Sequence, residues 1–205
     1  MATELLPIGI LVSGRGSNML AIADAIAAGQ VPACIKVVIS DRPGAPALAA
    51  ARQRGIEVMT LSRKQYPSRA AFETALAAAL KDKGVELVVL AGFMRLLSQT
   101  FLDQFPQRVI NIHPALLPAF PGLDAQRQAW EYGVKFSGCS VHFVDEGVDT
   151  GPIIAQAVVP VLDTDIPETL AERILAEEHR LYPQVIKWLA EGRVEVRGRR
   201  VFIRA

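Results

Sequence analysis

Short runs of apolar residues, rich in valine and isoleucine, recur along the first half of the chain without a clean alternation of apolar and polar positions. Such runs are typical of strands that are buried on both faces of a sheet. Alanine-rich segments of helical character separate them, and Ser68 is placed to cap the third of these segments. The predicted strands are Ile8–Ser13, Ile35–Ser40, Ile56–Leu61, Leu87–Ala91 and Val109–His113, and the predicted helices are Ser17–Ala28, Ala45–Arg54 and Arg69–Lys81. Because strand and helix alternate, the pattern predicts a parallel α/β sheet.

The pattern changes in the second half, where a proline-rich stretch at residues 114–122 predicts a rigid, irregular loop. Two later apolar strands are joined by a short acidic turn, which permits antiparallel pairing. The predicted elements are a helix at Ala125–Tyr132, strands at Cys139–Val144 and Ile153–Val161, a helix at Pro167–Leu189 that is kinked or interrupted near Pro183, and a hairpin at Val194–Arg204 that turns at residues 197–199.

The chain contains no internal repeat, low-complexity tract or recognisable linker, so we expect a single domain over residues 1–205. The expected fold is Rossmann-like: a mostly parallel twisted sheet with helices on both faces and antiparallel strands in the C-terminal half. A hydrophobic share of 51% with 21% charged residues excludes a largely disordered chain.

Charge and cysteine content limit the compartment and the partners. The net charge of +1 provides no overall field for nucleic acid or for a membrane surface, so a charged ligand must be held by local groups. Cys34 and Cys139 each lie in an apolar stretch, which predicts buried free thiols in a reducing compartment. The N-terminal residues 1–7 lack a positively charged leader, and no uncharged apolar segment is long enough to span a bilayer. We therefore expect a cytoplasmic protein.

The first candidate site is the segment Ser-Gly-Arg-Gly-Ser-Asn at residues 13–18, between the first predicted strand and helix. A glycine there lets backbone N–H groups approach an anion at the positive end of a helix, and Ser17 and Asn18 add side-chain donors. The segment is a candidate phosphate site; the alternative is a tight turn with a polar cap.

A dinucleotide-binding fold competes with this interpretation. Gly14 and Gly16 begin a G-x-G sequence, and Asp41 follows the second strand, where an acidic residue would bind a ribose. Met19 replaces the third glycine of that fingerprint and would crowd the packing of helix against strand, so the match is weak.

The second candidate site lies at the carboxyl end of the fifth strand, where open α/β sheets bind their ligands. Strand alternation places Asn111 and His113 on one face. An amide that donates to a developing oxyanion, beside an imidazole that holds or moves a proton, suits acyl transfer to an amine. The alternative is that both side chains satisfy the backbone of the proline-rich loop.

Asp149, in the glycine-flanked turn between the later strands, is the third candidate, because an aspartate beside His113 would orient the imidazole and favour its charged form. Asp145 and Glu146 are expected to form an exposed part of the same turn. His142, three residues after Cys139, is interpreted as core packing, and a metal site is not expected. The basic C-terminal residues 193–204 lack interleaved aromatic runs for stacking bases, so a solvated hairpin edge is expected.

Taken in order, these pieces resemble the phosphoribosylglycinamide formyltransferases, folate-dependent enzymes of purine biosynthesis. The resemblance covers nearly the whole chain. It rests on the segments at residues 13–18, 90–97, 111–118 and 141–144, on Asp149-Thr150-Gly151-Pro152, and on Glu178-His179 with Tyr182-Pro183.

The resemblance implies transfer of a formyl group from 10-formyltetrahydrofolate to the amine of glycinamide ribonucleotide, with no covalent enzyme intermediate and no metal. It implies that Asn111 and protonated His113 stabilise the oxyanion, that Asp149 holds His113 charged, and that His113 supplies a proton to the leaving nitrogen. The remaining residues are implied as ligand contacts: Gly16, Ser17 and Asn18 for the phosphate, Glu178 for the ribose side, and Arg69, Met94, Arg95, Leu96, Leu97 and Asn111 for the folate.

The resemblance further implies a ribonucleotide-binding N-terminal half and a folate-binding, catalytic C-terminal half, in a monomer or homodimer that acts on small molecules and binds no nucleic acid or membrane. Many relatives carry histidine in the loop after Pro121-Gly122, whereas this chain has Leu123, Asp124 and Gln126 there. We expect that any contact made by that histidine differs here.

Three other functions compete. Methionyl-tRNA formyltransferase would need an additional C-terminal domain and a basic surface, and the chain ends soon after its last helix. Formyltetrahydrofolate hydrolase would add an N-terminal regulatory domain, and the first strand begins near residue 8. In a nucleotide-binding module without catalysis, Asn111, His113 and Asp149 would not act together. Replacing His113 by Ala would then leave ligand binding and the cellular role unchanged.

Overall fold

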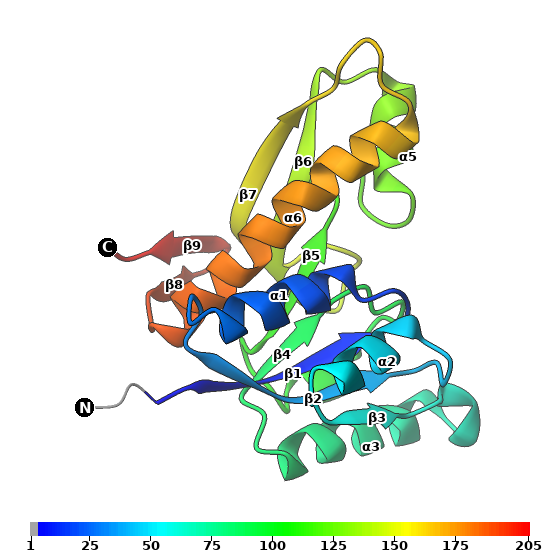
Figure 1. Ribbon diagram of the computed structural model, residues 1–205, viewed down its shortest axis with the longest axis vertical. Helices are drawn as coiled ribbons and strands as arrows, with labels where there is room; N and C mark the ends of the chain where they lie inside the picture. Colours follow the sequence, from blue (N-terminus) through cyan, green and yellow to red (C-terminus); the bar gives the residue numbers. More distant parts are fainter. Residues whose placement is uncertain (1–3) are drawn as a thin grey trace. The chain divides into compact units, whose positions relative to one another are not determined.

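The computed structural model describes residues 4–205, which form two compact units, one ending at Ile110 and the other spanning Asn111–Ala205 (Figure 1). The N-terminal residues 1–7 were expected to contain no leader, and the first three of them, Met1–Thr3, lie outside the described residues.

The first unit is a parallel sheet with helices on both faces. Its hydrogen-bonded strand order is β3-β2-β1-β4, with β5 next. Figure 1 shows α1 and α2 on one face of this sheet and α3 on the other. The strands are β1 (Leu6–Val12), β2 (Ala33–Ser40), β3 (Val58–Thr60), β4 (Leu87–Leu90) and β5 (Val109–His113), and the helices are α1 (Ser17–Ala27), α2 (Pro46–Gln53), α3 (Arg69–Asp82) and α4 (Gln99–Leu102), with a short 3-10 helix at Arg63–Gln65.

The predicted burial on both faces is confirmed for β1 and β4, which are buried at nearly every position. It is wrong for β3, which lies at the edge of the sheet and is half-buried at each position. A Cβ on Gly9 of β1 would lie 2.6 Å from Cδ2 of Leu80 in α3, so the glycine permits the close approach of this helix. Ser68 caps α3 as expected, since its side chain accepts a hydrogen bond from the amide of Ala71.

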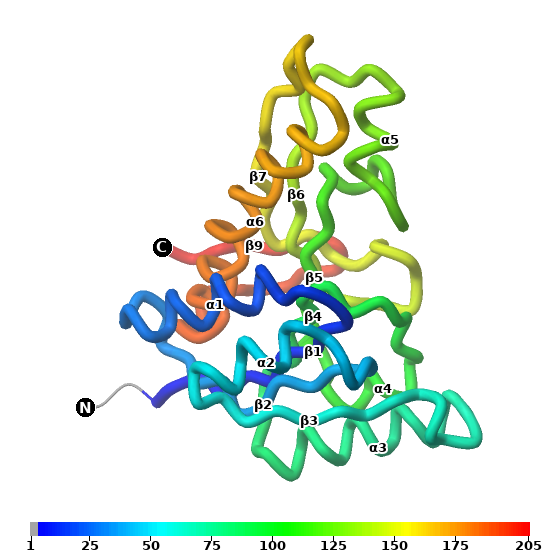
Figure 2. The backbone as a smooth tube through the Cα atoms, turned by 45° about the vertical axis from the view of Figure 1, so that its right-hand side comes forward, coloured from blue at the N-terminus to red at the C-terminus, as the bar shows by residue number. Residues whose placement is uncertain are grey.

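The second unit begins within β5 and continues with an antiparallel pair and a long helix. The pairing of β6 with β7 is antiparallel, as predicted, and the C-terminal hairpin is also confirmed. Figure 2 shows α6 running along β6 and β7. The elements are α5 (Ala125–Tyr132), β6 (Phe136–Phe143), β7 (Ile153–Pro160), α6 (Pro167–Ala190), β8 (Val194–Arg197) and β9 (Arg200–Ile203). The mostly parallel sheet with antiparallel C-terminal strands therefore confirms the expected fold class.

Three expectations need correction. The long helix α6 is not interrupted near Pro183, which lies inside a continuous helix with its ring buried. Cys139 is fully buried, but Cys34 is only half-buried, because it lies near the start of β2, where the strand is less covered than at its end. Asp145 is half-buried, whereas Glu146 is exposed as expected.

Along residues 4–205, no helix combines the length and the apolar character that a membrane span requires.

Candidate active site

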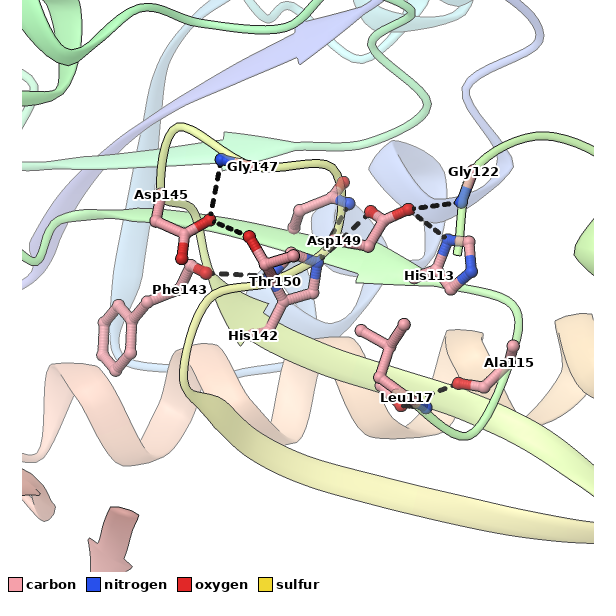
Figure 3. A network of polar contacts seen from close by, with 12 residues as sticks. His113, Ala115, Leu117, Gly122, His142, Phe143, Asp145, Gly147, Asp149 and Thr150 are labelled. Atoms are coloured by element: carbon pink, nitrogen blue, oxygen red, sulfur yellow. Dashed lines mark hydrogen bonds and ion pairs between the residues drawn. The ribbon is translucent and has the colours of Figure 1, made fainter. Parts of the chain in front are cut away.

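The three candidate catalytic residues come together in the second unit. Asn111 and His113 lie at the carboxyl end of β5, and Asp149 lies in the loop between β6 and β7. His142, near the end of β6, completes the cluster (Figure 3). The contacts of Asn111 and His113 with neighbours in this cluster fit the predicted placement of both on one face of the strand.

His113 is buried and has a partner at each ring nitrogen. Its Nδ1 lies 3.3 Å from Oδ2 of Asp149, and its Nε2 lies 2.8 Å from the carbonyl oxygen of Phe120. A carbonyl and a carboxylate only accept hydrogen bonds, so an acceptor faces each nitrogen of the ring. The imidazole therefore lies between one neutral and one charged acceptor.

His142 links Asn111 to Asp149. Its Nδ1 lies 2.8 Å from the carbonyl oxygen of Phe143, which requires Nδ1–H to be the donor. With Nε2 unprotonated, it accepts from the Asn111 amide nitrogen, 3.3 Å away, and this nitrogen keeps a second N–H for another acceptor. With Nε2 protonated, the ring instead donates toward Asp149, and both N–H groups of Asn111 are left for other acceptors. The same Nε2 lies 3.6 Å from Oδ1 of Asp149.

Asp149 is held by groups that favour its charged form. Burial alone would raise the pKa of Asp149, but contact with His142, the backbone N–H of Gly122 and the charge of His113 outweigh burial and bring the pKa below its usual 3.8. The Gly122 amide donates to Oδ2 over 2.9 Å. The backbone of Asp149 has a φ of 55°, in the left-handed region that aspartate adopts more readily than most residues.

The proline-rich loop is fastened to β6 by a buried hydroxyl. Ser140 Oγ donates to the carbonyl oxygen of Ala115 over 2.7 Å and accepts from the Leu117 amide over 3.0 Å. These bonds fix the chain between His113 and Phe120, whose carbonyl contacts the imidazole. The loop therefore contributes to the position of His113.

The candidate phosphate loop lies in the first unit, at the start of α1. Gly16 has a φ of 78° and precedes a helix of 11 residues, whose N-terminus is the positive end of the helix dipole. A Cβ on Gly16 would lie 2.5 Å from Cβ of Ala47 in α2. Ser17 begins the helix and Asn18 is buried beside it. This arrangement suits an anion.

Asp41, the residue on which a dinucleotide site would depend, is engaged within the protein. It is buried, and its Oδ1 accepts from Ser13 Oγ over 2.6 Å. Its Oδ2 accepts from Nε of Arg95, also over 2.6 Å. Ser13 Oγ in turn accepts from the Met94 amide over 2.9 Å, so Asp41 supports the segment after β4. A carboxylate with these partners is poorly placed to bind a ribose.

Most of the residues implied in folate contact lie around a cavity of about 420 Å³ in the first unit. Four of them line it together with three residues that the sequence did not single out. The lining consists of Arg63, Arg69, Phe72, Glu73, Met94, Arg95 and Leu96. Leu97 is buried outside this lining, and Asn111 belongs to the other unit.

Glu73 organises one wall of the cavity. This buried carboxylate accepts from Nε of Arg69 over 2.8 Å and also from the side chain and amide of Ser98. Arg69 donates its other arm to the carbonyl oxygen of Leu96 over 2.9 Å, and Arg95 lies over the ring of Phe72. The cavity therefore combines apolar surface with fixed guanidinium groups.

Glu178 is buried in α6, one turn before Tyr182. Burial and the charge of Glu178 together raise the pKa of Tyr182. Burial also raises the pKa of the Cys139 thiol in β6 to about 12, with a smaller contribution from Glu178. Glu178, the carboxylate that the resemblance assigns to the ribose side, therefore lies in the second unit.

Sequence reasoning missed several of these residues. His142 is buried, as expected, but it is part of a polar network rather than of the apolar core. Its position in the apolar stretch of β6 gave no sign of this, because the partners come from β5 and a loop far apart in sequence. Glu73 had a weak signal, as a charged residue on the apolar face of a predicted helix. No group of three or more possible metal ligands is found among residues 4–205.

Comparison with known proteins shows what the chain is similar to. The family model described as Formyl transferase matches residues 7–186. The chain is 42% identical over 187 residues to phosphoribosylglycinamide formyltransferase of Escherichia coli, covering 91% of this chain and 88% of that protein. A crystal structure of glycinamide ribonucleotide transformylase 1 from Symbiobacterium toebii has a TM-score of 0.97 at 54% identity, covering 98% of this chain and 95% of that one.

A third relative is much longer. The trifunctional purine biosynthetic protein adenosine-3 of Drosophila pseudoobscura is 49% identical over 187 residues, which cover 90% of this chain. The matched region spans only 14% of the length of that protein.

Proposed function

Because the chain belongs to the formyl transferase family, we propose that it transfers the formyl group of 10-formyltetrahydrofolate to the amine of 5'-phosphoribosylglycinamide in purine biosynthesis. The relatives from Escherichia coli and Bacillus subtilis, named phosphoribosylglycinamide formyltransferases, support this choice of reaction. The products are the N-formyl ribonucleotide and tetrahydrofolate.

The observation that carries the proposal is the contact network of Asn111, His113, His142 and Asp149. It combines one amide donor, a histidine with an acceptor facing each ring nitrogen, and a carboxylate whose pKa lies below its usual value. Formyl transfer to an amine needs these functions, because negative charge develops on the formyl oxygen and a proton must reach the leaving nitrogen.

In the proposed reaction, a bond forms between the substrate amine and the formyl carbon, and the bond from that carbon to the folate nitrogen breaks. Asn111 donates to the developing oxyanion with the N–H that His142 does not use. Protonated His113 adds positive charge and delivers a proton to the leaving nitrogen, directly or through water, and the proton that the attacking amine loses returns to the imidazole. Asp149 keeps His113 charged and oriented. His113 must release the carbonyl of Phe120 before Nε2 can act on a substrate.

The ribonucleotide phosphate is assigned to the start of α1, with Gly16, Ser17 and Asn18 as its contacts. The left-handed backbone of Gly16 and the positive end of the α1 dipole support this assignment. Glu178 is assigned to the ribose side.

The cavity of the first unit fits the folate donor. The aromatic part of a folate suits the apolar surface of Phe72, Met94 and Leu96, and its glutamate carboxylates suit Arg63 and Arg69. Arg95 and the buried Leu97 belong to the same segment, and Asn111 is assigned to the reacting end of the cosubstrate. When bound, this cosubstrate supplies the formyl group.

We further propose a cytoplasmic enzyme that acts as a monomer or homodimer on small molecules, without nucleic acid, membrane or metal. The net charge of +1 and the free cysteines support this setting.

An absorbance assay with 10-formyl-dideazafolate, run with and without glycinamide ribonucleotide, tests the function. We expect deformylation that depends on the ribonucleotide and falls by roughly 100-fold or more in His113→Ala, since general acid–base groups typically contribute that much. Glu146→Gln, an exposed acid in the loop of Asp149, is the control and should retain activity. Deformylation without the ribonucleotide would favour a hydrolase, and no turnover would return attention to dinucleotide binding, tested by titration with NAD(H).

A further inference from the structure

The loop of residues 144–152, which carries Asp149, is closed by hydrogen bonds among its own residues and between its two ends. Within the loop, Asp145 accepts from the Thr150 hydroxyl over 2.5 Å and from the Gly147 amide over 3.1 Å (Figure 3). At its end, the Phe143 amide donates to the carbonyl oxygen of Pro152 over 2.9 Å. These bonds close the loop but leave its orientation toward the histidines to other contacts.

One such contact comes from the C-terminal hairpin. Nη2 of Arg199 donates to the carbonyl oxygen of Thr150 over 2.6 Å. Arg199 lies in the turn between β8 and β9, next to Gly198, whose φ of 60° permits the tight reversal. The loop and this turn are far apart in sequence, so the hydrogen bond fixes one against the other.

The hairpin that carries Arg199 is held together by the pairing of its strands and by contacts between arginine and glutamate side chains. Its strands pair in register from Val194 and Ile203 to Arg197 and Arg200. Glu195 accepts from Nε of Arg197 over 2.6 Å and from Nη2 of Arg204 over 2.6 Å, and both arginines hold the pKa of Glu195 down to about 2. Strand β9 also lies beside β7, which continues directly from the Asp149 loop.

The position of the contact matters because Thr150 follows Asp149 directly. The left-handed backbone of Asp149 is an uncommon conformation that its surroundings must maintain. Fixing the Thr150 carbonyl restricts the Thr150–Gly151 peptide, one residue after Asp149. It therefore limits the movement of the chain that carries a carboxylate in contact with His113, His142 and Gly122.

We propose that Arg199 is a positioning residue for the reaction: it braces the loop so that Asp149 stays within reach of both histidines. The inference rests on the proposed function for its kinetic part only. Arg199 lies in the C-terminal hairpin, beyond residue 186, where the match to the family model ends.

The test compares Arg199→Ala with Arg199→Lys and with Arg200→Ala. Arg200 is the matched control, since it belongs to the same hairpin and lies over the ring of Phe202, 5.0 Å from its centre. Two quantities are measured: kcat and KM for both substrates, and the hydrogen-exchange rate of the Gly122 amide in the ligand-free protein, because that amide donates to Asp149.

We expect Arg199→Ala to lower kcat about fivefold and to speed Gly122 exchange by a similar factor, the size expected for one lost hydrogen bond, with little change in KM. Arg199→Lys should restore most of both, because an ammonium can still donate to the carbonyl. Arg200→Ala should leave both near wild type.

The proposal is overturned if Arg199→Ala and Arg200→Ala show the same kcat and the same Gly122 exchange. A change in KM alone would equally oppose it, since positioning of Asp149 acts on the chemical step. If the wild-type protein transfers no formyl group, the proposed function fails, while the exchange rates still decide whether Arg199 braces the loop.

Discussion

Oδ2 of Asp149 lies 3.3 Å from Nδ1 of His113, while the opposite nitrogen of the same ring faces the carbonyl oxygen of Phe120. The aspartate therefore does two things at once. It places a charged acceptor beside Nδ1, and it leaves Nε2 as the ring nitrogen that faces the carbonyl oxygen of Phe120. This relationship gives the first prediction.

Asp149→Asn should lower kcat by roughly 100-fold, because an amide has no charge to stabilise the imidazolium and can present an N–H where an acceptor is needed. The pH–rate profile should also change, since the charged form of His113 loses its partner. Steady-state rates between pH 5 and pH 9, roughly the range in which a histidine titrates, measure both effects.

Glu146→Gln removes the same charge from the same loop at an exposed position and is the control for this experiment. It should leave the rate and the profile unchanged. A profile that is identical in wild type and Asp149→Asn would contradict the role given to the contact between Asp149 and His113.

The phosphate loop gives the second prediction. Gly16→Ala places a side chain in left-handed backbone and brings its Cβ within 2.5 Å of Cβ of Ala47. Backbone strain and overpacking together should lower the free energy of unfolding by roughly 2–4 kcal/mol, measured by urea denaturation. The affinity for the ribonucleotide should fall as the first turn of α1 shifts.

Gly14→Ala is the matched control, because no described atom lies within 4 Å of the Cβ that it would add. Its unfolding free energy and ribonucleotide affinity should stay close to those of wild type. Equal losses in both variants would show that the loop does not depend on the conformation of Gly16.

Much of this fold follows from the sequence pattern, for physical reasons that particular elements show. The helix predicted at Ala125–Tyr132 has the observed bounds, and the strand predicted at Val109–His113 does too. The helix at Gln99–Leu102 and the 3-10 helix at Arg63–Gln65 were not predicted, because elements of three or four residues are too short to show a period. Pro183 was given too much weight as a helix breaker, since tertiary packing keeps it inside α6.

Less of the candidate site than of the fold could be predicted from the sequence. Asn111 and His113 were found because strand alternation places residues i and i+2 on one face. The contact between His113 and Asp149 was an expectation that the geometry supports. His142 was missed because a histidine within an apolar strand looks like core, and its partners depend on how β5, β6 and the following loop pack together. Long-range contacts such as Arg199 with Thr150 leave no local pattern.

Asp165, just before α6, gives a prediction for acid stability. Its carboxylate accepts both arms of the Arg173 guanidinium and the backbone N–H of Leu162, and these bonds hold the pKa of Asp165 far below its usual 3.8. A carboxylate with a lowered folded-state pKa stabilises the fold fully above its unfolded pKa, and this contribution is lost as the pH falls toward the folded value.

Melting temperatures of wild type and Asp165→Asn should therefore differ clearly at pH 7 and converge as the pH falls below about 4. Asp163→Asn is the control. The side chain of Asp163 is 96% exposed, and its ion pair with the exposed Lys135, at 3.6 Å, is of the kind that contributes little to stability. It should melt like wild type at every pH. A gap between wild type and Asp165→Asn that stays constant down to pH 2.5 would show that the ionised carboxylate adds no stability.

The two cysteines give the last prediction, because their surroundings differ sharply. Cys139 is fully buried in β6, and burial, reinforced by the charge of Glu178, raises the pKa of its thiol to about 12. At pH 8 only about one thiol in ten thousand would then be a thiolate, the form that reacts with alkylating reagents. Cys34 is half-buried near the start of β2 and more accessible to a reagent.

Mass spectrometry after brief treatment with iodoacetamide should therefore find one label, on Cys34, in the native protein and two after denaturation in guanidinium. Labelling of native Cys139 at the rate of Cys34 would mean that β6 opens readily beneath α6, and the cluster built on that strand would then be far less rigid than its buried contacts indicate.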